Sequence, residues 1–489
     1  MTAPGPAHRR GRVGLLGGLL LFVLLLLLPP PAGMSVAAWR TAAMALLMAV
    51  WWITEAIPIP ATALAPLALS PLLGIAPIGP AAAPYANPVI FLFLGGFLIA
   101  AALEESGLHR RIALVILNAV GPRPVRVVGG FMAAVAFVSM WVSNTATVAM
   151  FLPLAVSLAD LVDRSGAPGE EAGNFGVALM LGLAAAANIG GLGTLIGTPP
   201  NALLTGFMAE TYQRSIGFGQ WMLVGVPLVL VALPLVWFLL VRVLFPIRLT
   251  EVPGGRDLLQ AELAALGKPA REELIVGAVA ALTAAAWIGR PLLERVIPGL
   301  SDAGIAVIAG LLLFMAPSSR KAGGRTLDWS RAKLLPWGVL LLFGGGLSLA
   351  EAIQTSGLAT WMGGWLEAAR GLPVVLVVLL VTALLVFLTE LASNTAIAAA
   401  FLPVAGALAV AIGADPLLLA APAALAASCG FMLPVGTPPN AMVYSTGRIA
   451  MGQMVRSGLY FDLLMIVLVT AAAFLIVGVV FAGPVSGGS

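Results

Sequence analysis

The chain has 489 residues, of which 60% are hydrophobic and only 9% are charged, and its mean hydropathy is +1.05. Ordinary soluble domains carry about 25% charged residues, so this composition excludes water-soluble classes of enzyme and binding protein. With one cysteine and two histidines, the chain cannot form a disulfide framework or a Cys/His metal cluster. Its net charge of +4 indicates no nucleic-acid partner, because the basic residues lie in short loops between the apolar runs.

The first apolar run, residues 13–28, follows a basic stretch and precedes three prolines. This pattern fits a signal peptide as well as a first membrane span. We favour an uncleaved span, because a basic segment before an apolar helix keeps the N-terminus in the cytoplasm.

Apolar runs recur along the whole chain, and lipid leaves such runs only the α-helix as a spanning structure. We therefore expect an all-α polytopic membrane protein with about eleven transmembrane helices. The predicted spans lie near 13–32, 37–54, 60–79, 88–105, 174–210, 221–241, 272–289, 301–316, 334–352, 416–446 and 459–482.

Two further apolar stretches, 125–162 and 372–413, are too long for one crossing, and each is interrupted at its centre by Ser-Asn-Thr. We predict a re-entrant helical hairpin for each. Irregular backbone at membrane depth is tolerated only where protein or a wet cavity surrounds it. Both hairpin tips should therefore face a binding site inside the protein, at membrane depth.

The basic residues are unequally distributed in this layout. Twenty of the 25 lie in loops on the side of the N-terminus, Arg320 and Lys321 among them. The five on the other side are Arg40, Arg214, Arg290, Arg295 and Arg370. Cytoplasmic loops are rich in lysine and arginine, so we expect a multi-pass inner (plasma) membrane protein with a cytoplasmic N-terminus and an external C-terminus.

The second half of the chain repeats motifs of the first. Ser-Asn-Thr at 143–145 recurs at 393–395, and Gly-Thr-Pro-Pro-Asn at 197–201 recurs at 436–440. Five predicted crossings per copy is an odd number, so the copies should be inverted, which brings broken helices together near the midplane. The predicted organisation is an N-terminal span, a first inverted repeat, a cytoplasmic linker and a second inverted repeat, at 1–36, 37–250, 251–270 and 271–489.

The Ser-Asn-Thr motif offers two hydroxyls, a carboxamide and, at a helix start, free backbone N–H groups. These groups suit carboxylate oxygens, and the side-chain oxygens suit a hard cation such as sodium. A single occurrence would more often bond only to neighbouring backbone. Recurrence at the same place in both copies favours a binding role.

Thr-Pro-Pro-Asn inside an apolar span removes two backbone donors and breaks the helix. We expect the carbonyls left free there to bind a cation or the substrate, in preference to a simple packing kink. Neither motif contains a lysine or an arginine. A bound anion must then be compensated by dipoles and co-bound cations, which predicts coupling to two or more sodium ions.

Acidic residues near membrane depth are candidates for function. Glu390, three residues before Ser393, is a candidate for orienting the second hairpin or for titration. For Glu104 and Glu105, at the end of a span, an interfacial ion pair is favoured over function.

Together these motifs resemble those of the divalent-anion:sodium symporter family. The resemblance covers residues 37–482 and rests on the run 51–58 (Trp-Trp-Ile-Thr-Glu-Ala-Ile-Pro), both Ser-Asn-Thr tips and the run 431–441 (Phe-Met-Leu-Pro-Val-Gly-Thr-Pro-Pro-Asn-Ala). It implies a sodium-coupled carrier of dicarboxylate, citrate or sulfate. It also implies a homodimer whose protomers each have a scaffold domain and a transport domain that moves as an elevator.

The resemblance assigns site residues as well. Sodium positions carry over to four residues in each copy: Ser139, Ser143, Asn144 and Gly197, then Thr389, Ala392, Asn394 and Gly436. Substrate contacts carry over to eight residues: Ser143, Asn144, Thr145, Ser393, Asn394, Thr395, Thr437 and Pro438.

We expect sodium-coupled symport of a small divalent carboxylate anion, with a C4-dicarboxylate such as succinate, malate or fumarate favoured. Sulfate or citrate symport and sodium-independent exchange stay open, although Ser139 and Thr389 argue against exchange without sodium. An intramembrane enzyme is disfavoured because no nucleophile–base pair is present in the motifs. A channel is disfavoured because inverted broken helices suit a closed midplane site.

Overall fold

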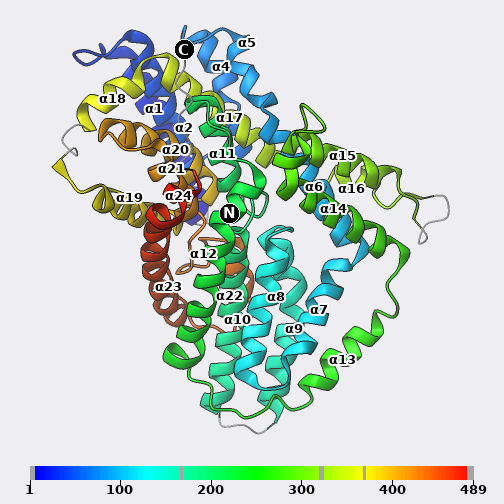
Figure 1. Ribbon diagram of the computed structural model, residues 1–489. Helices are drawn as coiled ribbons and strands as arrows, with labels where there is room; N and C mark the ends of the chain where they lie inside the picture. Colours follow the sequence, from blue (N-terminus) through cyan, green and yellow to red (C-terminus); the bar gives the residue numbers. More distant parts are fainter. Residues whose placement is uncertain (1–5, 166–168, 319–323, 367–370, 482–489) are drawn as a thin grey trace, which may run out of the picture.

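The computed structural model describes residues 6–165, 169–318, 324–366 and 371–481. Helices dominate these ranges (Figure 1), which confirms the predicted all-α class. Nine helices within the described ranges are long and apolar enough to cross a membrane. Three basic residues used in the topology prediction, Arg320, Lys321 and Arg370, lie outside the described residues. The two ends of the chain, residues 1–5 and 482–489, also lie outside them.

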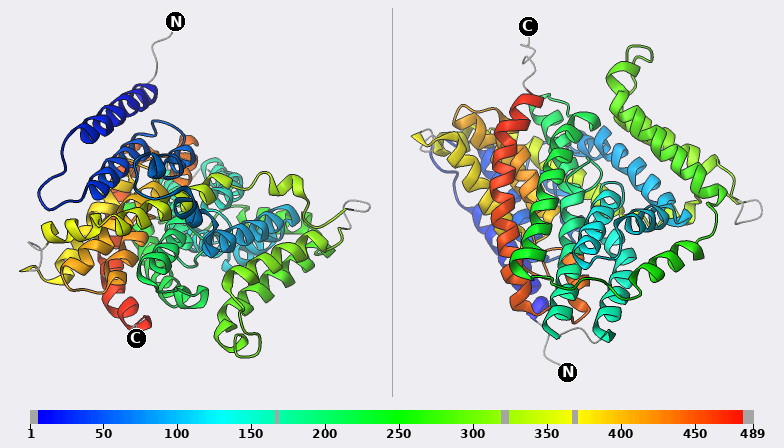
Figure 2. Two further views of the ribbon diagram at one scale, coloured as in Figure 1. Left: turned by 90° about the horizontal axis from the view of Figure 1, so that it is seen from above. Right: turned by 60° about the horizontal axis from the view of Figure 1, so that its bottom comes forward.

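The first two predicted spans are helices, α1 (Pro6–Leu27) and α2 (Val36–Thr54). Side chains of α2 pack directly on the backbone of α1, because a Cβ on Gly14 would lie 2.0 Å from Thr54 Oγ1 and one on Gly18 would meet the indole of Trp51. Glycines four residues apart are a common contact between membrane helices. α1 lies at the edge of the molecule (Figure 2) and is held there by α2.

The prediction of one continuous span at 60–79 was wrong. Seven prolines between positions 58 and 84 interrupt the helix, since each lacks a backbone donor. The stretch instead forms four short elements: α3 (Ile59–Thr62), α4 (Ala65–Leu72), α5 (Ile78–Ala82) and the 3₁₀ turn η1 (Ala83–Ala86).

The first predicted hairpin is present as two packed helices, α8 (Pro124–Ser139) and α9 (Asn144–Arg164), with its bend at 140–143. It follows α6 (Pro88–Ser106) and α7 (Leu108–Val120). α7 occupies a basic stretch for which no helix was predicted. It buries Ala113, Leu114 and Leu117 and leaves Arg110 exposed.

The next span is broken in its middle, as its Thr-Pro-Pro-Asn motif predicts. α10 (Gly169–Gly191) and α11 (Pro199–Tyr212) are separated by residues 192–198. α12 (Phe218–Phe238) follows and ends in a π-helical turn, η2 (Leu239–Leu244). α10 is a central helix, because 89% of its apolar window is buried.

The predicted linker at 251–270 contains a helix of its own, α13 (Gly255–Ala265), which packs against α7. Arg111 of α7 forms an ion pair with Glu273, just after the linker. Three helices begin the predicted second copy: α14 (Arg271–Leu293), α15 (Asp302–Met315) and α16 (Trp329–Ala332). α14 stands at an edge of the molecule (Figure 2).

The second copy presents its helices in the same order as the first. α19 and α20 pack together as the second hairpin, and residues 427–437 separate α21 from α22. α23 ends in a π-helical turn, as α12 does. The bounds are α17 (Trp337–Thr355), α18 (Leu358–Leu366), α19 (Val374–Thr389), α20 (Asn394–Ala411), α21 (Pro416–Ala426), α22 (Pro438–Ser445), α23 (Met451–Ala472), η4 (Ala473–Val477) and α24 (Gly478–Val480).

The two copies meet at their broken helices. α10 of the first copy packs against α22 of the second, and α11 packs against α20 and α21. Figure 1 shows α10, α11, α21 and α22 in the interior, with α7, α13 and α14 along one side. The two breaks therefore lie close to each other at the centre of the molecule.

Candidate functional site

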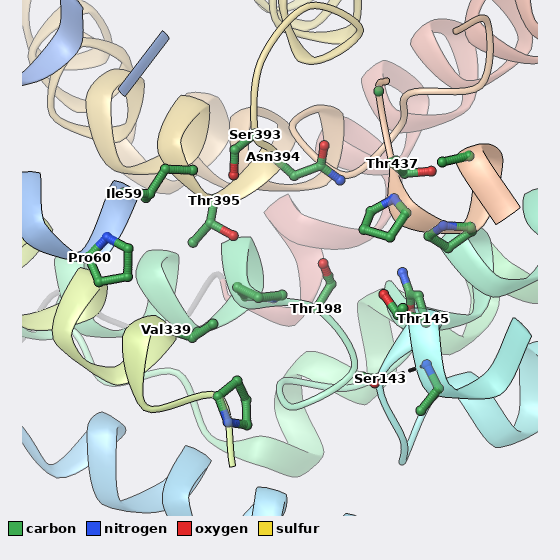
Figure 3. Close-up of a pocket in the computed structure, with 18 of the residues that line it drawn as sticks. Ile59, Pro60, Ser143, Thr145, Thr198, Val339, Ser393, Asn394, Thr395 and Thr437 are labelled. Atoms are coloured by element: carbon green, nitrogen blue, oxygen red, sulfur yellow. Dashed lines mark hydrogen bonds between the residues drawn. The ribbon is translucent and has the colours of Figure 1, made fainter. Parts of the chain in front are cut away.

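A cavity of about 1930 Å³ lies between the two hairpin tips and the two helix breaks. Figure 3 shows the tips, 143–145 and 393–395, on different sides of this space, with Ile59, Pro60 and Val339 on a further wall. All eight predicted substrate contacts line the cavity. The structure thus brings together side chains that are about 250 positions apart in the sequence.

At the first tip, three oxygen atoms converge behind the cavity wall. The hydroxyl of Ser139 lies 2.6 Å from Asn144 Oδ1 and 2.8 Å from the carbonyl oxygen of Ala187. A serine hydroxyl has one hydrogen, so it donates to only one of these acceptors at a time. Ser143 caps α9 by accepting from the N–H of Ala146 at 3.3 Å. The tip is therefore both a helix start and a cluster of oxygens.

The second tip repeats this geometry. The hydroxyl of Thr389 lies 2.7 Å from Asn394 Oδ1 and 2.8 Å from the carbonyl oxygen of Ala427. Ser139 and Thr389 are fully buried and lie behind the asparagines instead of lining the cavity. Both were predicted as sodium positions, and both contact the asparagine of their own tip.

The remaining predicted sodium positions, Gly197, Ala392 and Gly436, line the cavity. A Cβ on Gly191 would lie 2.8 Å from Asn144 Oδ1 and 3.1 Å from the carbonyl oxygen of Gly197. These two oxygens therefore approach the same point. A Cβ on Gly197 would lie 2.4 Å from the carbonyl oxygen of Gly191, so only glycine fits there.

The asparagine of each Thr-Pro-Pro-Asn motif stabilises its own helix break. Asn201 Nδ2 donates to the carbonyls of Thr194 at 2.8 Å and Gly191 at 3.3 Å. Asn440 Nδ2 donates to the two equivalent carbonyls of the second break, at 3.0 and 3.1 Å. A cation or the substrate was the predicted partner of free carbonyls at the breaks, and for these four the motif's own asparagine also supplies a donor.

Hydrogen bonds cross between the two copies in a reciprocal manner. Asn188 Nδ2 donates to Thr437 Oγ1 at 3.1 Å, and the hydroxyls of Thr198 and Ser428 lie 3.2 Å apart. Asn188 and Ser428 occupy equivalent positions in the repeat, as do Thr198 and Thr437. Asn188 also accepts from Asn144 Nδ2 at 3.4 Å. It therefore connects the first tip to the second break.

Three of these residues, Asn188, Thr198 and Ser428, were absent from the predicted site. Thr198 could have been found, because it is the counterpart of the predicted contact Thr437. Asn188 and Ser428 are the polar residues at one position shared by the two copies, each directly after an apolar run, which is a weak but usable signal.

Glu390 is buried and anchors the second tip to the second break. Its carboxylate accepts from the backbone N–H groups of Met432 at 2.7 Å and Leu433 at 2.8 Å. This geometry agrees with the predicted role in orienting the hairpin. The equivalent residue of the first copy is Met140, whose carbonyl accepts from the hydroxyl of Thr194 at 2.5 Å. The two copies therefore hold their tips by different chemistry.

The charged residues of the cavity lie away from the motifs. Glu105 pairs with Arg331 at 3.5 Å, which confirms the ion pair predicted for Glu105. Within the described lining, Arg331 and Arg12 are the basic side chains, and neither belongs to a tip or a break. The part of the cavity between the tips is thus polar but free of basic groups.

The chain is similar to known transporters. The family described as the sodium:sulfate symporter transmembrane region matches residues 12–481. The sodium-dependent dicarboxylate transporter SdcS of Staphylococcus saprophyticus is 44% identical over 442 residues, 89% of this chain and 85% of that protein. The protein of the same name from Staphylococcus aureus is 42% identical over 445 residues, 90% of this chain and 86% of that one.

Two solved structures share the fold at low sequence identity. The YdaH transporter of Alcanivorax borkumensis aligns with a TM-score of 0.56 and 16% identity, over 83% of this chain and 88% of that one. MtrF of Neisseria gonorrhoeae aligns with a TM-score of 0.57 and 13% identity, over 96% and 95%. From the match over residues 12–481, the chain belongs to the sodium:sulfate symporter family, which confirms the resemblance to divalent-anion:sodium symporters.

Proposed function

We propose that this protein is a secondary active transporter that couples sodium entry to the import of a C4-dicarboxylate such as succinate, malate or fumarate. One observation carries the proposal: equivalent tips and breaks from the two copies line a single cavity with oxygen clusters and helix starts. The names of the relatives from two staphylococci, sodium-dependent dicarboxylate transporter, support it.

The two tips provide donors for a dianion. α9 and α20 begin at Asn144 and Asn394, so their N-terminal N–H groups and dipoles favour negative charge at each tip. Hydroxyls stand beside both helix starts and line the cavity: Ser143, Thr145, Ser393, Thr395 and Thr437. In the proposed binding mode, each carboxylate of the substrate would contact one tip. Pro438 would contact the same ligand from the second break.

The oxygen clusters are the proposed sodium sites. In the first copy, Ser139, Ser143, Asn144 and Gly197 would supply ligands, with the carbonyl of Ala187 close by. In the second copy, Thr389, Ala392, Asn394 and Gly436 would do so, with the carbonyl of Ala427. Sodium prefers oxygen ligands, and neither tip carries a basic side chain, so bound sodium would compensate the anion's charge.

The cavity suggests the direction of access. Its described lining extends from the tips to Arg12, Glu55 and Arg331, which belong to the predicted cytoplasmic side. We therefore place this form of the protein as open to the cytoplasm, in an inner membrane with the N-terminus inside and the C-terminus outside. Import then requires a second form in which the same site reaches the outside.

The repeated geometry supports two inverted copies, 37–250 and 271–489, joined by a linker at 251–270 and preceded by a retained span at 1–36. The close packing of α1 on α2 supports retention of that span. The hairpins and broken helices would form the moving transport domain, and α2, α6, α14 and α17 the scaffold. The proposed assembly is a homodimer that works as an elevator.

Sulfate is the second candidate substrate, because the matched family is described as sodium:sulfate symporters. Sulfate concentrates its two charges on one centre, whereas a C4-dicarboxylate separates them. Competition therefore distinguishes them: at saturating substrate, a tenfold excess of unlabelled succinate should reduce labelled succinate uptake to about one-tenth by isotope dilution, while sulfate at the same concentration should leave most of it.

Uptake of radiolabelled succinate into proteoliposomes tests the transport proposal. We expect accumulation under an inward sodium gradient and only background uptake under an equal potassium gradient. Monensin, which collapses the sodium gradient, should abolish accumulation without damaging the protein. Equal uptake with sodium and with potassium would overturn sodium coupling.

A further inference from the structure

Equivalent glycines stand in the middle of α6 and α17, two of the proposed scaffold helices. Gly96 of α6 ends the run Leu-Phe-Leu-Gly-Gly at 92–96, and Gly346 of α17 ends the run Leu-Phe-Gly-Gly-Gly at 342–346. The residue directly before each Gly-Thr-Pro-Pro-Asn motif is apolar: Ile196 in the first copy and Val435 in the second. Each copy therefore combines a glycine in a scaffold helix with an apolar side chain at its helix break.

In the first copy these two residues are packed together. A Cβ on Gly96 would lie 2.8 Å from Cγ2 of Ile196 and 3.3 Å from its Cβ. The Ile196 side chain therefore rests on the backbone of α6, and it is only 8% exposed. Because isoleucine is β-branched and stiff at χ1, a methyl group on Gly96 could be accepted only if the first break moved away from α6.

In the second copy the equivalent contact is replaced by another. A Cβ on Gly346 would have Ala399 Cβ at 3.3 Å and Leu203 Cδ2 at 3.4 Å as its closest neighbours from other helices. Val435 is 77% exposed and lines the cavity. The glycine of the second copy therefore packs on α20 and α11, while the apolar side chain of its own break stays open to the cavity.

Whole helices show the same difference between the copies. α17 packs on α11 and α20. The counterparts of these three helices, α6, α22 and α9, instead all line the cavity, through residues such as Phe97, Ala441 and Thr145. One scaffold helix is thus closed on the broken helices and the other faces them across open space, in the same form of the protein.

In a carrier built from inverted repeats, alternating access moves one unit against the other around a fixed site, and exchanging the arrangements of the two copies gives the second form. We propose that Gly96 and Gly346 are alternating docking positions for the two breaks. Ile196 rests on Gly96 in the form described here, and Val435 rests on Gly346 in the form that opens to the outside. This inference rests on the alternating access of the proposed function and assigns residues to it.

Alanine at the two glycines should act in opposite directions. Gly96→Ala places a methyl group against Ile196, so it should disfavour the present form. Gly346→Ala meets its neighbours at 3.3 and 3.4 Å, which small shifts accommodate, so it should leave the present form intact. In the other form the same methyl group would occupy the space that Val435 needs. Overpacking of this kind should shift the equilibrium between the two forms by about 5- to 150-fold.

A cysteine introduced by Ala441→Cys reports which form is present. Ala441 is exposed and lines the cavity, whereas its counterpart Ala202 is fully buried, so exchange of the copies should bury position 441. Reaction with a water-soluble maleimide is followed in purified full-length protein, and the buried Cys429 of wild type gives the background. Gly96→Ala should slow the labelling. Gly346→Ala should leave it as fast or faster, while uptake of labelled succinate into proteoliposomes falls.

Second changes at the breaks test the two contacts themselves. Ile196→Ala removes the carbons that Gly96→Ala presses on, so the pair should recover the labelling rate of Ala441→Cys alone. Val435→Ala should restore succinate uptake to Gly346→Ala, although Val435 stands in the open cavity in the present form. The crossed pairs, Gly96→Ala with Val435→Ala and Gly346→Ala with Ile196→Ala, should recover nothing.

Gly363→Ala in α18 is the control for an added methyl group, because a Cβ there meets nothing within 4 Å. It should change neither labelling nor uptake, and thermal unfolding checks that every variant is folded.

Three outcomes would overturn the proposal. The first is a folded Gly346→Ala protein with wild-type uptake, and the second is a change of labelling in the same direction for both glycine variants. The third is recovery by the crossed pairs as complete as by the matched pairs. If Gly346→Ala does not fold, Gly96→Ala with and without Ile196→Ala decides the question. Opposite labelling shifts in a protein that takes up no succinate would instead contradict the proposed substrate and leave the docking positions standing.

Discussion

The side-chain amide of Asn188 donates to the hydroxyl of Thr437 at 3.1 Å, which joins the first copy's central helix α10 to the second copy's helix break. Ser428 and Thr198 form the reciprocal contact at 3.2 Å. Because each bond crosses between copies, displacement of one break displaces the other. In the proposed site, a ligand that contacts Thr437 would therefore act on both halves of the chain.

Replacing Asn188 by alanine should weaken substrate binding. The change removes the donor to Thr437 and the acceptor for Asn144, and it leaves buried polar groups without partners. Such a loss costs about 1–3 kcal/mol, so we expect the dissociation constant of succinate at saturating sodium to rise by about 5- to 150-fold. Equilibrium binding of labelled succinate to purified protein measures the effect.

The control for this change is Asn174→Ala on the same helix. Asn174 donates to the carbonyl of Pro246 at 3.3 Å near the surface, far from the cavity lining. Its removal should leave succinate affinity within twofold. Equal losses in the two variants would mean that Asn188 matters only for helix stability.

Removal of the buried hydroxyls, by Ser139→Ala or Thr389→Val, should weaken sodium binding more than anion binding. Each hydroxyl lies beside the asparagine of a tip without lining the cavity. We expect the half-maximal sodium concentration to rise by about tenfold, equivalent to about 1.4 kcal/mol, while uptake recovers at high sodium. Sodium titrations of succinate uptake report both quantities.

Ser157→Ala is the matched control for these two variants, because the Ser157 hydroxyl donates to Pro153 on the exposed side of the first hairpin. It should leave the sodium titration unchanged. A Ser139→Ala protein with wild-type sodium dependence but weak succinate binding would assign this hydroxyl to the anion instead.

Gly197→Ala should abolish transport. The added Cβ would lie 2.4 Å from the carbonyl oxygen of Gly191, and backbone must move to accept it. The thermal unfolding temperature and the affinity for succinate should both fall. Gly173→Ala serves as the control, since a Cβ there meets nothing within 4 Å. An alanine in an exposed helical position is stabilising by about 0.5–1 kcal/mol, so this variant should unfold at or above the wild-type temperature.

Two neighbouring arginines of α7 should differ in their effect on stability. The Arg111 and Glu273 side chains are only 13% and 6% exposed, whereas those of Arg110 and Glu262 are 52% and 35% exposed. Breaking a buried pair costs about 3–5 kcal/mol, but an exposed pair contributes at most about 1 kcal/mol. Arg111→Ala should therefore lower the unfolding temperature by several degrees and Arg110→Ala hardly at all. Equal shifts would show that α7 is not docked on the linker through Arg111.

Apolar length and repeated motifs were enough to predict most helices, both hairpin tips and both breaks. The prediction of one continuous helix at 60–79 failed because hydropathy is averaged over a window of residues, whereas a proline interrupts a helix at a single position. α7 was missed because its basic residues suggested a loop, although its apolar residues recur with helical spacing.

The site was predicted where a motif marked it and missed where single residues meet across the fold. Asn188 and Ser428 are single polar residues after apolar runs, and nothing in the linear sequence says which partner each one faces. Thr437 as the partner of Asn188, and Thr198 as the partner of Ser428, follow only from the packing of the two copies.

The central claim is that the two Ser-Asn-Thr tips form one sodium-dependent anion site. Binding of labelled succinate to purified wild type, Asn144→Ala and Asn394→Ala, each titrated with sodium, tests it most directly. We predict that sodium raises succinate affinity in wild type and that either alanine variant, folded as judged by thermal unfolding, loses this binding. Succinate binding in both variants with wild-type affinity and wild-type sodium dependence would contradict the account.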